Sequence, residues 1–342
     1  MKDASQRDGP VAPRPGDPVA PPGYRLVEER RVLGSVVRAV WRTPGGDQLE
    51  WTSRGYRKGR QPRAGAAGAA PARHRPPLIG LAPHVLSWWV AVVFATGSVF
   101  FVIGAAGAVT GPTRWWPNAM YFVGSVLFTT GASLQLREIS LAARDLLLPP
   151  RPRSHGLHRY WLFRPGRLDW NASAVQLVGT VLFNVNCFFG MSMSLTHRQD
   201  DVRVWVPSTI ASVCFVSSSW LALVEAEGRW FSWRPRQLEW WITVGSLLGS
   251  WGFLISSLAG FFLGGDLSAV VTGLLGPHGE TLWLEYAVDG VLLAGSLWFL
   301  LSTYLLIPEA LREARDGPPE RRDQRRAEAT ARDSARAPAA SP

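Results

Sequence analysis

The sequence predicts an all-α fold: a polytopic membrane protein whose six transmembrane helices form three parallel repeats of a two-helix hairpin. Two observations lead to this prediction. The middle of the 342-residue chain holds six apolar stretches, each close to the roughly 20 residues that cross a bilayer as a helix. Short motifs also return at fixed offsets within them. The expected spans lie near residues 86–109, 116–136, 172–194, 207–225, 240–263 and 284–307.

Tryptophan and arginine support the spans and orient them. The chain has 17 Trp, many at the ends of the apolar stretches, and Trp prefers the membrane–water interface. Arg concentrates in both tails, in the loop 137–167 and in the loop after the fourth span, whereas the other loops carry little. Because positive loops stay inside, we expect a multi-pass protein of the cell inner (plasma) membrane with both termini in the cytoplasm.

The odd-numbered spans begin with one motif. They follow PHVLSW (83–88), PGRLDW (165–170) and PRQLEW (235–240), which share Pro-x-x-Leu-[Ser/Asp/Glu]-Trp. Nine residues after the last Trp of each motif comes a Gly, and four residues after that Gly comes a Phe. The motif therefore marks three similar helices. Their pairs are Gly97 with Phe101, Gly179 with Phe183, and Gly249 with Phe253.

The even-numbered spans form a second series. In each, a small residue is followed four positions later by Phe and fourteen positions later by Glu. The three sets are Gly124, Phe128 and Glu138; Ala211, Phe215 and Glu225; and Gly295, Phe299 and Glu309. The chain therefore reads as three copies of one hairpin. Parallel repeats share an axis along the membrane normal, so a ring of three hairpins about a pseudo-threefold axis is our hypothesis.

The repeated Gly and Phe lie on one face of each helix, because residues four apart are neighbours on a helix surface. In lipid the hydrophobic effect does not drive helices together, and small residues allow their backbones to approach. We therefore interpret the Gly and Phe positions as helix-packing residues. The alternative is that they line a pore.

The three Glu that end the even-numbered spans need compensating cations, because helix C-termini disfavour anions. Arg137, Arg229 and Arg312 lie nearby in the sequence. We favour a cytoplasmic rim in which Glu–Arg pairs lock the helix ends together. One alternative is a functional ring of acids that binds cations. Another is that the three Glu side chains are solvated.

The third span is more polar than the others. Gln176, Thr180 and Asn184 recur every four residues, and Asn186 stands where most copies have a small residue. Amides inside a membrane usually bond a neighbouring helix, but these residues could also form a polar path. Asp289 in the sixth span is an intramembrane acid, which makes a functional role worth testing, although its position favours the outer interface.

Motifs for catalysis do not occur in the sequence. It has no His-Glu-x-x-His, phosphate-binding loop or nucleophile elbow, and its six His are scattered over tails and loops. We therefore expect no enzyme, no cofactor, no metal and no nucleic-acid partner. The juxtamembrane Arg clusters favour membrane lipids as partners, and a membrane protein is the other expected partner.

Polar segments flank the predicted bundle. Alternating apolar and polar residues on both sides of the turn signal Pro44-Gly45-Gly46-Asp47 predict a small hairpin at 36–56. The remaining polar segments are expected to be mostly disordered. We divide the chain into a tail at 1–82, hairpin repeats at 83–138, 139–227 (with its leading cytoplasmic loop) and 228–311, and a tail at 312–342.

Paired helices with a central Gly-Ser-x-x-Phe resemble the YrhK family of small bacterial membrane proteins. FATGSVFF (94–101) and FVGSVLF (122–128) carry the resemblance best, whereas Ala211 departs from it at the Gly. It would cover three diverged copies of a YrhK-like domain over residues 83–309, and it implies an architecture but no activity. We therefore expect a structural or regulatory membrane module that binds lipid or a protein partner. The alternative is a small channel or transporter that uses the polar third helix.

Overall fold

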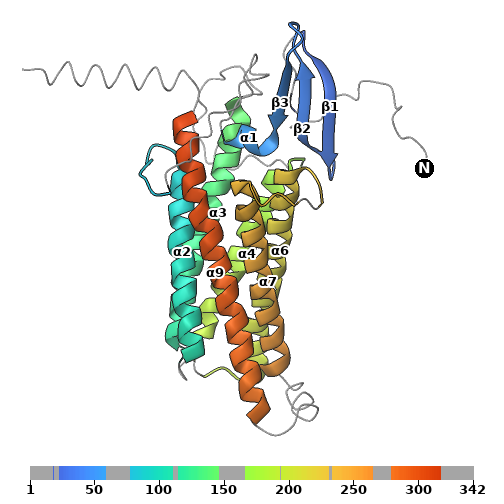
Figure 1. Ribbon diagram of the computed structural model, residues 1–342. Helices are drawn as coiled ribbons and strands as arrows, with labels where there is room; N and C mark the ends of the chain where they lie inside the picture. The colour runs from blue at the N-terminus through green and yellow to red at the C-terminus, as the bar shows by residue number, and fades with distance from the viewer. Residues whose placement is uncertain are drawn as a thin grey trace, which may run out of the picture.

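A computed structural model describes residues 18, 23–58, 78–110, 115–145, 166–192, 194–230, 233–264 and 279–316. Figure 1 shows long helices in a bundle with a small sheet at one end, which we call the capped end. The long helices are α2 (Leu86–Thr110), α3 (Trp115–Asp145), α4 (Leu168–Gly190), α6 (Val206–Glu227), α7 (Leu238–Gly264) and α9 (Gly279–Asp316). The short helix α5 (His197–Asp200) and a π-helical turn, η2 (Asp201–Trp205), lead into α6.

The six predicted spans are confirmed within the described residues. Six helices are long and apolar enough to cross a membrane. They are Leu86–Thr110, Trp115–Ser140, Leu168–Gly190, Arg198–Glu227, Leu238–Phe262 and Ala287–Arg315. The chain is therefore a multi-pass integral membrane protein with an all-α bundle.

Neighbouring helices close into a ring (Figure 1). Helix α2 packs against α3, α4 against α6, and α7 against α9, which makes three hairpins. The hairpins meet where α3 packs against α4 and α6 against α7, and α9 packs back against α2. The contacts thus agree with the predicted ring. The equivalence of the three hairpins as repeats of one unit stays a prediction.

Inside each hairpin, a Gly on one helix lies against a Phe on the other. A Cβ added to Gly97 would lie 2.7 Å from the ring of Phe128, and one added to Gly124 would lie 2.7 Å from the ring of Phe101. Because such contacts are too short for real Cβ atoms, only Gly allows the two helices to approach this closely. The matching distances are 3.0 Å for Gly179 to Phe215, 2.8 Å for Gly249 to Phe299, and 3.1 Å for Gly295 to the carbonyl oxygen of Gly249.

Phenylalanine fills the middle of the bundle. The rings of Phe101, Phe183 and Phe253, one from each hairpin, form a triangle whose centroid distances are 5.7, 5.6 and 5.5 Å. Their edge-to-face and tilted contacts are the arrangements that aromatic rings prefer. The Phe residues of the even-numbered spans extend this cluster: Phe128, Phe215 and Phe299.

Between hairpins, the helices are joined by side-chain hydrogen bonds. From α4 to α3, Asn184 Nδ2 donates to Thr129 Oγ1 at 2.9 Å. Between α6 and α7, the hydroxyls of Ser219 and Ser250 lie 3.0 Å apart. Further bonds across these junctions join Gln135 to Ser173, Asn118 to the carbonyl oxygen of Gly190, Ser208 and Ser212 to Ser257, Ser219 to Ser246, and Ser98 to Thr303. Polar side chains thus hold one hairpin to the next.

The capped end carries a folded unit, residues 23–58, which we call the cap. Its antiparallel sheet has the order β1-β2-β3, and a one-turn helix follows the last strand. The strands are β1 (Arg25–Val32), β2 (Ser35–Arg42) and β3 (Gln48–Thr52), and the helix is α1 (Ser53–Arg57). Val32 and Val37 pack against Leu168 and Val224, so the sheet rests on the ends of α4 and α6.

The cap is a larger folded unit than the small hairpin that we expected within residues 1–82. The hairpin expected at 36–56 is present as β2 and β3, with its turn closed by a Thr43 to Asp47 hydrogen bond of 2.8 Å. However, residues 53–57 are helical, and β1 adds a third strand. Strand β1 was not predicted because its sequence, RLVEERRV, is charged and lacks a regular apolar alternation. The other residues of the expected disordered tail, apart from 78–82, lie almost entirely outside the described residues.

Two predicted boundaries are also wrong. Helix α3 continues past Glu138 to Asp145, where we expected a loop, and Ile139 is buried within it. Helix α9 continues to Asp316, although residues 312–342 were expected to be disordered. Leu311 packs against the start of the first hairpin, beyond residue 307, where the span expected from the sequence ends. The rest of the C-terminal tail lies outside the described residues.

Candidate functional site at the capped end

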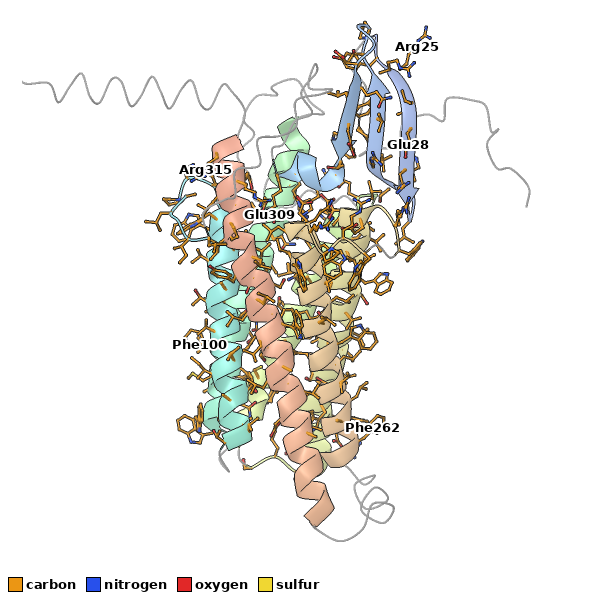
Figure 2. The ribbon with its side chains drawn as sticks, viewed as in Figure 1. Arg25, Glu28, Phe100, Phe262, Glu309 and Arg315 are labelled. Carbon is orange, nitrogen blue, oxygen red and sulfur yellow. The ribbon has the colours of Figure 1, made fainter. Side chains whose placement is uncertain are left out.

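The capped end gathers the three acids of the predicted rim. Glu138, Glu225 and Glu309 lie toward the ends of α3, α6 and α9, and all three are buried. Figure 2 labels Glu309 close to where α1 meets the bundle, and it is 1% exposed. Burying an ionised carboxylate is costly unless a cation and hydrogen bonds compensate it. The stability of this arrangement therefore depends on which cations and hydrogen-bond donors lie against these acids.

Three cations from the cap face the three acids. Arg54 donates from Nη2 to both carboxylate oxygens of Glu309, at 3.0 and 3.1 Å. Lys58 Nζ donates to Glu138 Oε1 at 3.0 Å. The third pair completes the set: Arg57 Nη2 lies 3.6 Å from Glu225 Oε2, and the Ser53 hydroxyl donates to Glu225 Oε1 at 2.9 Å.

The sequence of α1 explains how one short helix reaches three long ones. Arg54, Arg57 and Lys58 are spaced i, i+3 and i+4, which places them on one side of a single helical turn. Strand β3 ends directly before this turn, so the sheet holds the turn over the end of the bundle. One cation then points to each hairpin.

The Arg57–Glu225 pair differs from the other two in its geometry. At 3.6 Å it is an ion pair without a direct hydrogen bond, and Arg57 Nε has no hydrogen-bond partner among the described residues. Burial lowers the pKa of the Arg57 guanidinium, but the carboxylates of Glu225 and Asp169 raise it, and the net pKa lies above its ordinary value. Arg57 is therefore charged.

Arg54, Arg57 and Lys58, which we did not expect at the rim, pair with the three acids. Arg137, Arg229 and Arg312 are near in sequence, whereas Arg54 lies 255 residues from Glu309. Lys58 is 80 residues from Glu138. The available signal was the cluster SRGYRK at 53–58, three cations within one turn's length, directly after a predicted hairpin.

Further buried polar pairs surround the rim. Arg167 donates from Nε to Asp169 Oδ1 at 3.0 Å, and the Trp170 backbone N–H donates to the same oxygen at 2.8 Å. At the corresponding position of the first hairpin, the Ser87 hydroxyl donates to Glu313 at 2.6 Å. The starts of α2 and α4 are thus tied by polar side chains at the level of the cap.

The residues of the predicted polar path lie on α4 and α9. Thr180 is fully buried and donates to its own helix at Leu177 O, at 2.8 Å. Asn184 bonds α3, and Asn186 is buried as well. Gln176 is partly buried on α4, whereas Asp289 is partly buried on α9, whose main packing partners are α7 and α2. Interhelical bonding therefore accounts for Asn184, and the polar path as a whole stays a prediction.

Metal binding has no candidate among the described residues, where no group of three or more His, Cys, Asp and Glu could hold an ion. Cys187 and Cys214 are free thiols within the bundle. No family model, no curated protein and no solved structure matches the chain. The resemblance to the YrhK family thus stays a prediction, and the geometry of the capped end carries the functional argument.

Proposed function

We propose that this integral membrane protein is a structural or regulatory module whose cap docks on the bundle and presents its sheet to a lipid or protein partner. One observation carries the proposal: a single turn of helix neutralises one buried acid from each of the three hairpins. The three pairs balance in charge. By the distribution of Arg in the loops, the cap lies in the cytoplasm.

The ion pairs favour a defined cap orientation. Buried ion pairs contribute little net stability but strongly penalise arrangements that leave one charge unpaired. A rotated cap would leave at least one buried Glu without its cation. The rim therefore supports a module that holds its cap in one position relative to the membrane.

The edge of the sheet supports a partner-binding role. Strand β1 pairs with β2 only, so its other edge is free of sheet neighbours among the described strands. Its side chains Leu26 and Val27 are exposed. Edge strands offer backbone N–H and C=O groups to another chain. Strand β1 is therefore the surface that we assign to a protein partner.

A cross-linking experiment tests this proposal. A photo-reactive residue at Val27 should cross-link to a defined partner in native membranes, and Arg54→Glu should abolish the cross-link by releasing the cap. The exchange variant Arg54→Glu with Glu309→Arg should restore it. The same cross-link in Arg54→Glu as in the wild type would contradict the role of the docked cap. Arg42→Glu is the control, because Arg42 is exposed at the end of β2.

A channel or transporter is the second candidate, and one observation favours it. Asn184 Oδ1 is buried without a hydrogen-bond partner among the described residues. The triangle of Phe rings on the axis favours the first candidate, because it fills the centre where a wet path would run. Ion or solute flux in proteoliposomes that falls on Asn184→Leu would favour the second candidate. Absence of flux, with Asn184→Leu only lowering stability, would favour the first.

A further inference from the structure

Residues 78–83, with the sequence LIGLAP, form an irregular segment shortly before α2. Leu78, Ile79 and Leu81 are 64%, 81% and 83% exposed, which makes them among the most exposed large apolar residues of the described chain. Soluble proteins rarely gather such side chains in one exposed patch without a partner. The segment is drawn in Figure 1 as the teal loop beside the upper ends of α2 and α9.

The segment lies alongside the part of α9 that belongs to its membrane span. The Tyr304 hydroxyl donates to Leu78 O at 3.3 Å, and a Cβ on Gly80 would lie 3.1 Å from the Leu311 side chain. Both partners fall within the span Ala287–Arg315. Tyr304 precedes the rim residue Glu309 by five positions, or about 7 Å at a rise of about 1.5 Å per residue. The segment therefore lies alongside the last turns of this helix, from Tyr304 to Leu311.

Three carbonyl groups of this irregular segment accept hydrogen bonds from aromatic side chains. Besides the Tyr304 bond, the Trp88 indole donates to Gly80 O at 3.1 Å, and the Trp89 indole donates to Pro83 O at 2.9 Å. The Val85 N–H donates to Ala82 O at 3.0 Å. Carbonyl groups in water need no such partners, whereas irregular backbone in a membrane must be satisfied internally. Tyr and Trp are also the residues that prefer the interface.

The third hairpin provides a contrast. There the Trp241 indole donates to Pro235 O at 2.8 Å, with the same spacing as Trp89 and Pro83. The exposed residues around that turn include the aromatic Trp233, together with Arg234 and Arg236, in place of aliphatic ones. The indole bond is therefore common to both hairpins, but the exposed aliphatic side chains belong to the first.

We propose that residues 78–81 insert into the lipid leaflet at the capped end, with Leu78, Ile79 and Leu81 among the acyl chains just beneath the headgroups. The occupant of this surface is lipid, since the segment lies alongside the end of the α9 span and four of its six carbonyl groups accept hydrogen bonds. The inference does not depend on the proposed function, because it concerns the segment before α2 and not the partner of the cap. It adds an interfacial anchor between the cap and the bundle.

A fluorescence experiment tests the insertion. Ile79→Cys and, as the matched control, Val27→Cys are placed in the full chain with Cys187→Ala and Cys214→Ser, and each is labelled with the environment-sensitive dye NBD. The protein is reconstituted in phosphatidylcholine–phosphatidylglycerol vesicles with or without spin-labelled lipid. At residue 79 we expect blue-shifted emission, at least twofold quenching by the lipid spin label, and little quenching by aqueous iodide. At residue 27 we expect no blue shift, little quenching by the lipid spin label and strong quenching by aqueous iodide.

Two results would overturn the insertion. Quenching of residue 79 by iodide as strong as at residue 27 would place the segment in water. Protection from iodide without quenching by the lipid label would mean that another protein surface covers it.

A second measurement keeps the two native cysteines. In the otherwise unchanged chain, Ile79→Asp should raise amide hydrogen exchange at residues 79–82 several-fold, whereas Ile79→Met should leave it unchanged. Equal exchange in both variants would contradict the inference.

Discussion

The junctions inside the hairpins and the junctions between them are built largely from different interactions, with the bond from the Ser302 hydroxyl to Ile242 O inside the third hairpin as an exception. Inside a hairpin, Gly lies against Phe, and the backbones approach until a Cβ would clash, as at Gly97 and Phe128. Between hairpins, hydroxyl and amide side chains bond across the junction, as at Ser98 and Thr303, 3.0 Å apart. Since lipid provides no hydrophobic driving force between helices, both kinds of junction rely on direct contact. One helix can therefore pack by close backbone approach on one face and by side-chain hydrogen bonds on another.

The Gly-Ser pair at the centre of the helices explains how both chemistries fit. Successive residues on a helix with 3.6 residues per turn point about 100° apart. Gly97 therefore faces α3 within its hairpin, and Ser98 faces α9 of the neighbouring hairpin. Ser212 and Ser250 likewise lie between α6 and α7. The Gly-Ser pair thus forms two junctions from two adjacent positions.

The largest effect is expected where the cap holds all three hairpins together. Arg54→Ala leaves Glu309 buried and unpaired, which should destabilise the docked cap by about 3–5 kcal/mol. Hydrogen exchange of the cap amides in nanodiscs measures the loss. If charge is the cause, Arg54→Ala with Glu309→Leu should recover most of it, because an apolar replacement removes the unpaired charge.

The control for this prediction is an exposed ion pair of the same sheet. Arg38 and Glu50 lie 2.7 Å apart with side chains 38% and 56% exposed, and exposed pairs contribute about 0–1 kcal/mol. Arg38→Ala should therefore change the free energy of cap opening, measured by hydrogen exchange, by less than about 1 kcal/mol. A loss at Arg54 no larger than at Arg38 would mean that the rim pairs do not hold the cap.

The next largest effect is expected inside a hairpin. Gly97→Val forces a side chain against Phe128 and the α3 backbone, and overpacking of this kind costs about 1–3 kcal/mol. Unfolding by SDS titration in mixed micelles measures the change. Gly290→Val is the matched control, because a Cβ at Gly290 has no atom within 4 Å. Equal losses at both positions would show that helix propensity, and not the close approach, sets the cost.

Local patterns in the sequence were sufficient to predict the spans and the Gly–Phe junctions. Hydropathy depends on about 20 consecutive residues, and the Gly–Phe spacing is only four residues. The serine junctions were missed because a Ser in an apolar helix can also bond its own backbone, as Ser296 does to Leu292 O. Nothing in the local sequence distinguishes these two roles.

The pairing of each rim acid with its cation could not be predicted from the sequence, for a different reason. Glu309 and Arg54 are separated by 255 residues, and no local pattern relates residues at such a distance. A five-residue helix such as α1 also has too few residues to show a periodicity. The acids were predicted because their own helices repeat. Their cations occur once in the chain, in a segment that matches no repeat.

The smallest effect is expected between hairpins, and it distinguishes the two kinds of junction most directly. Hydrogen bonds between membrane helices average about 0.6 kcal/mol in double-mutant cycles, so Ser98→Ala and Thr303→Val should show a coupling energy of about that size in SDS unfolding. A cycle that combines Ser98→Ala with Ser219→Ala should show none, because each residue belongs to a different junction. A Ser98–Thr303 coupling above about 2 kcal/mol would exceed the range of such bonds. The junctions between hairpins would then be as strong as the Gly–Phe contacts within them.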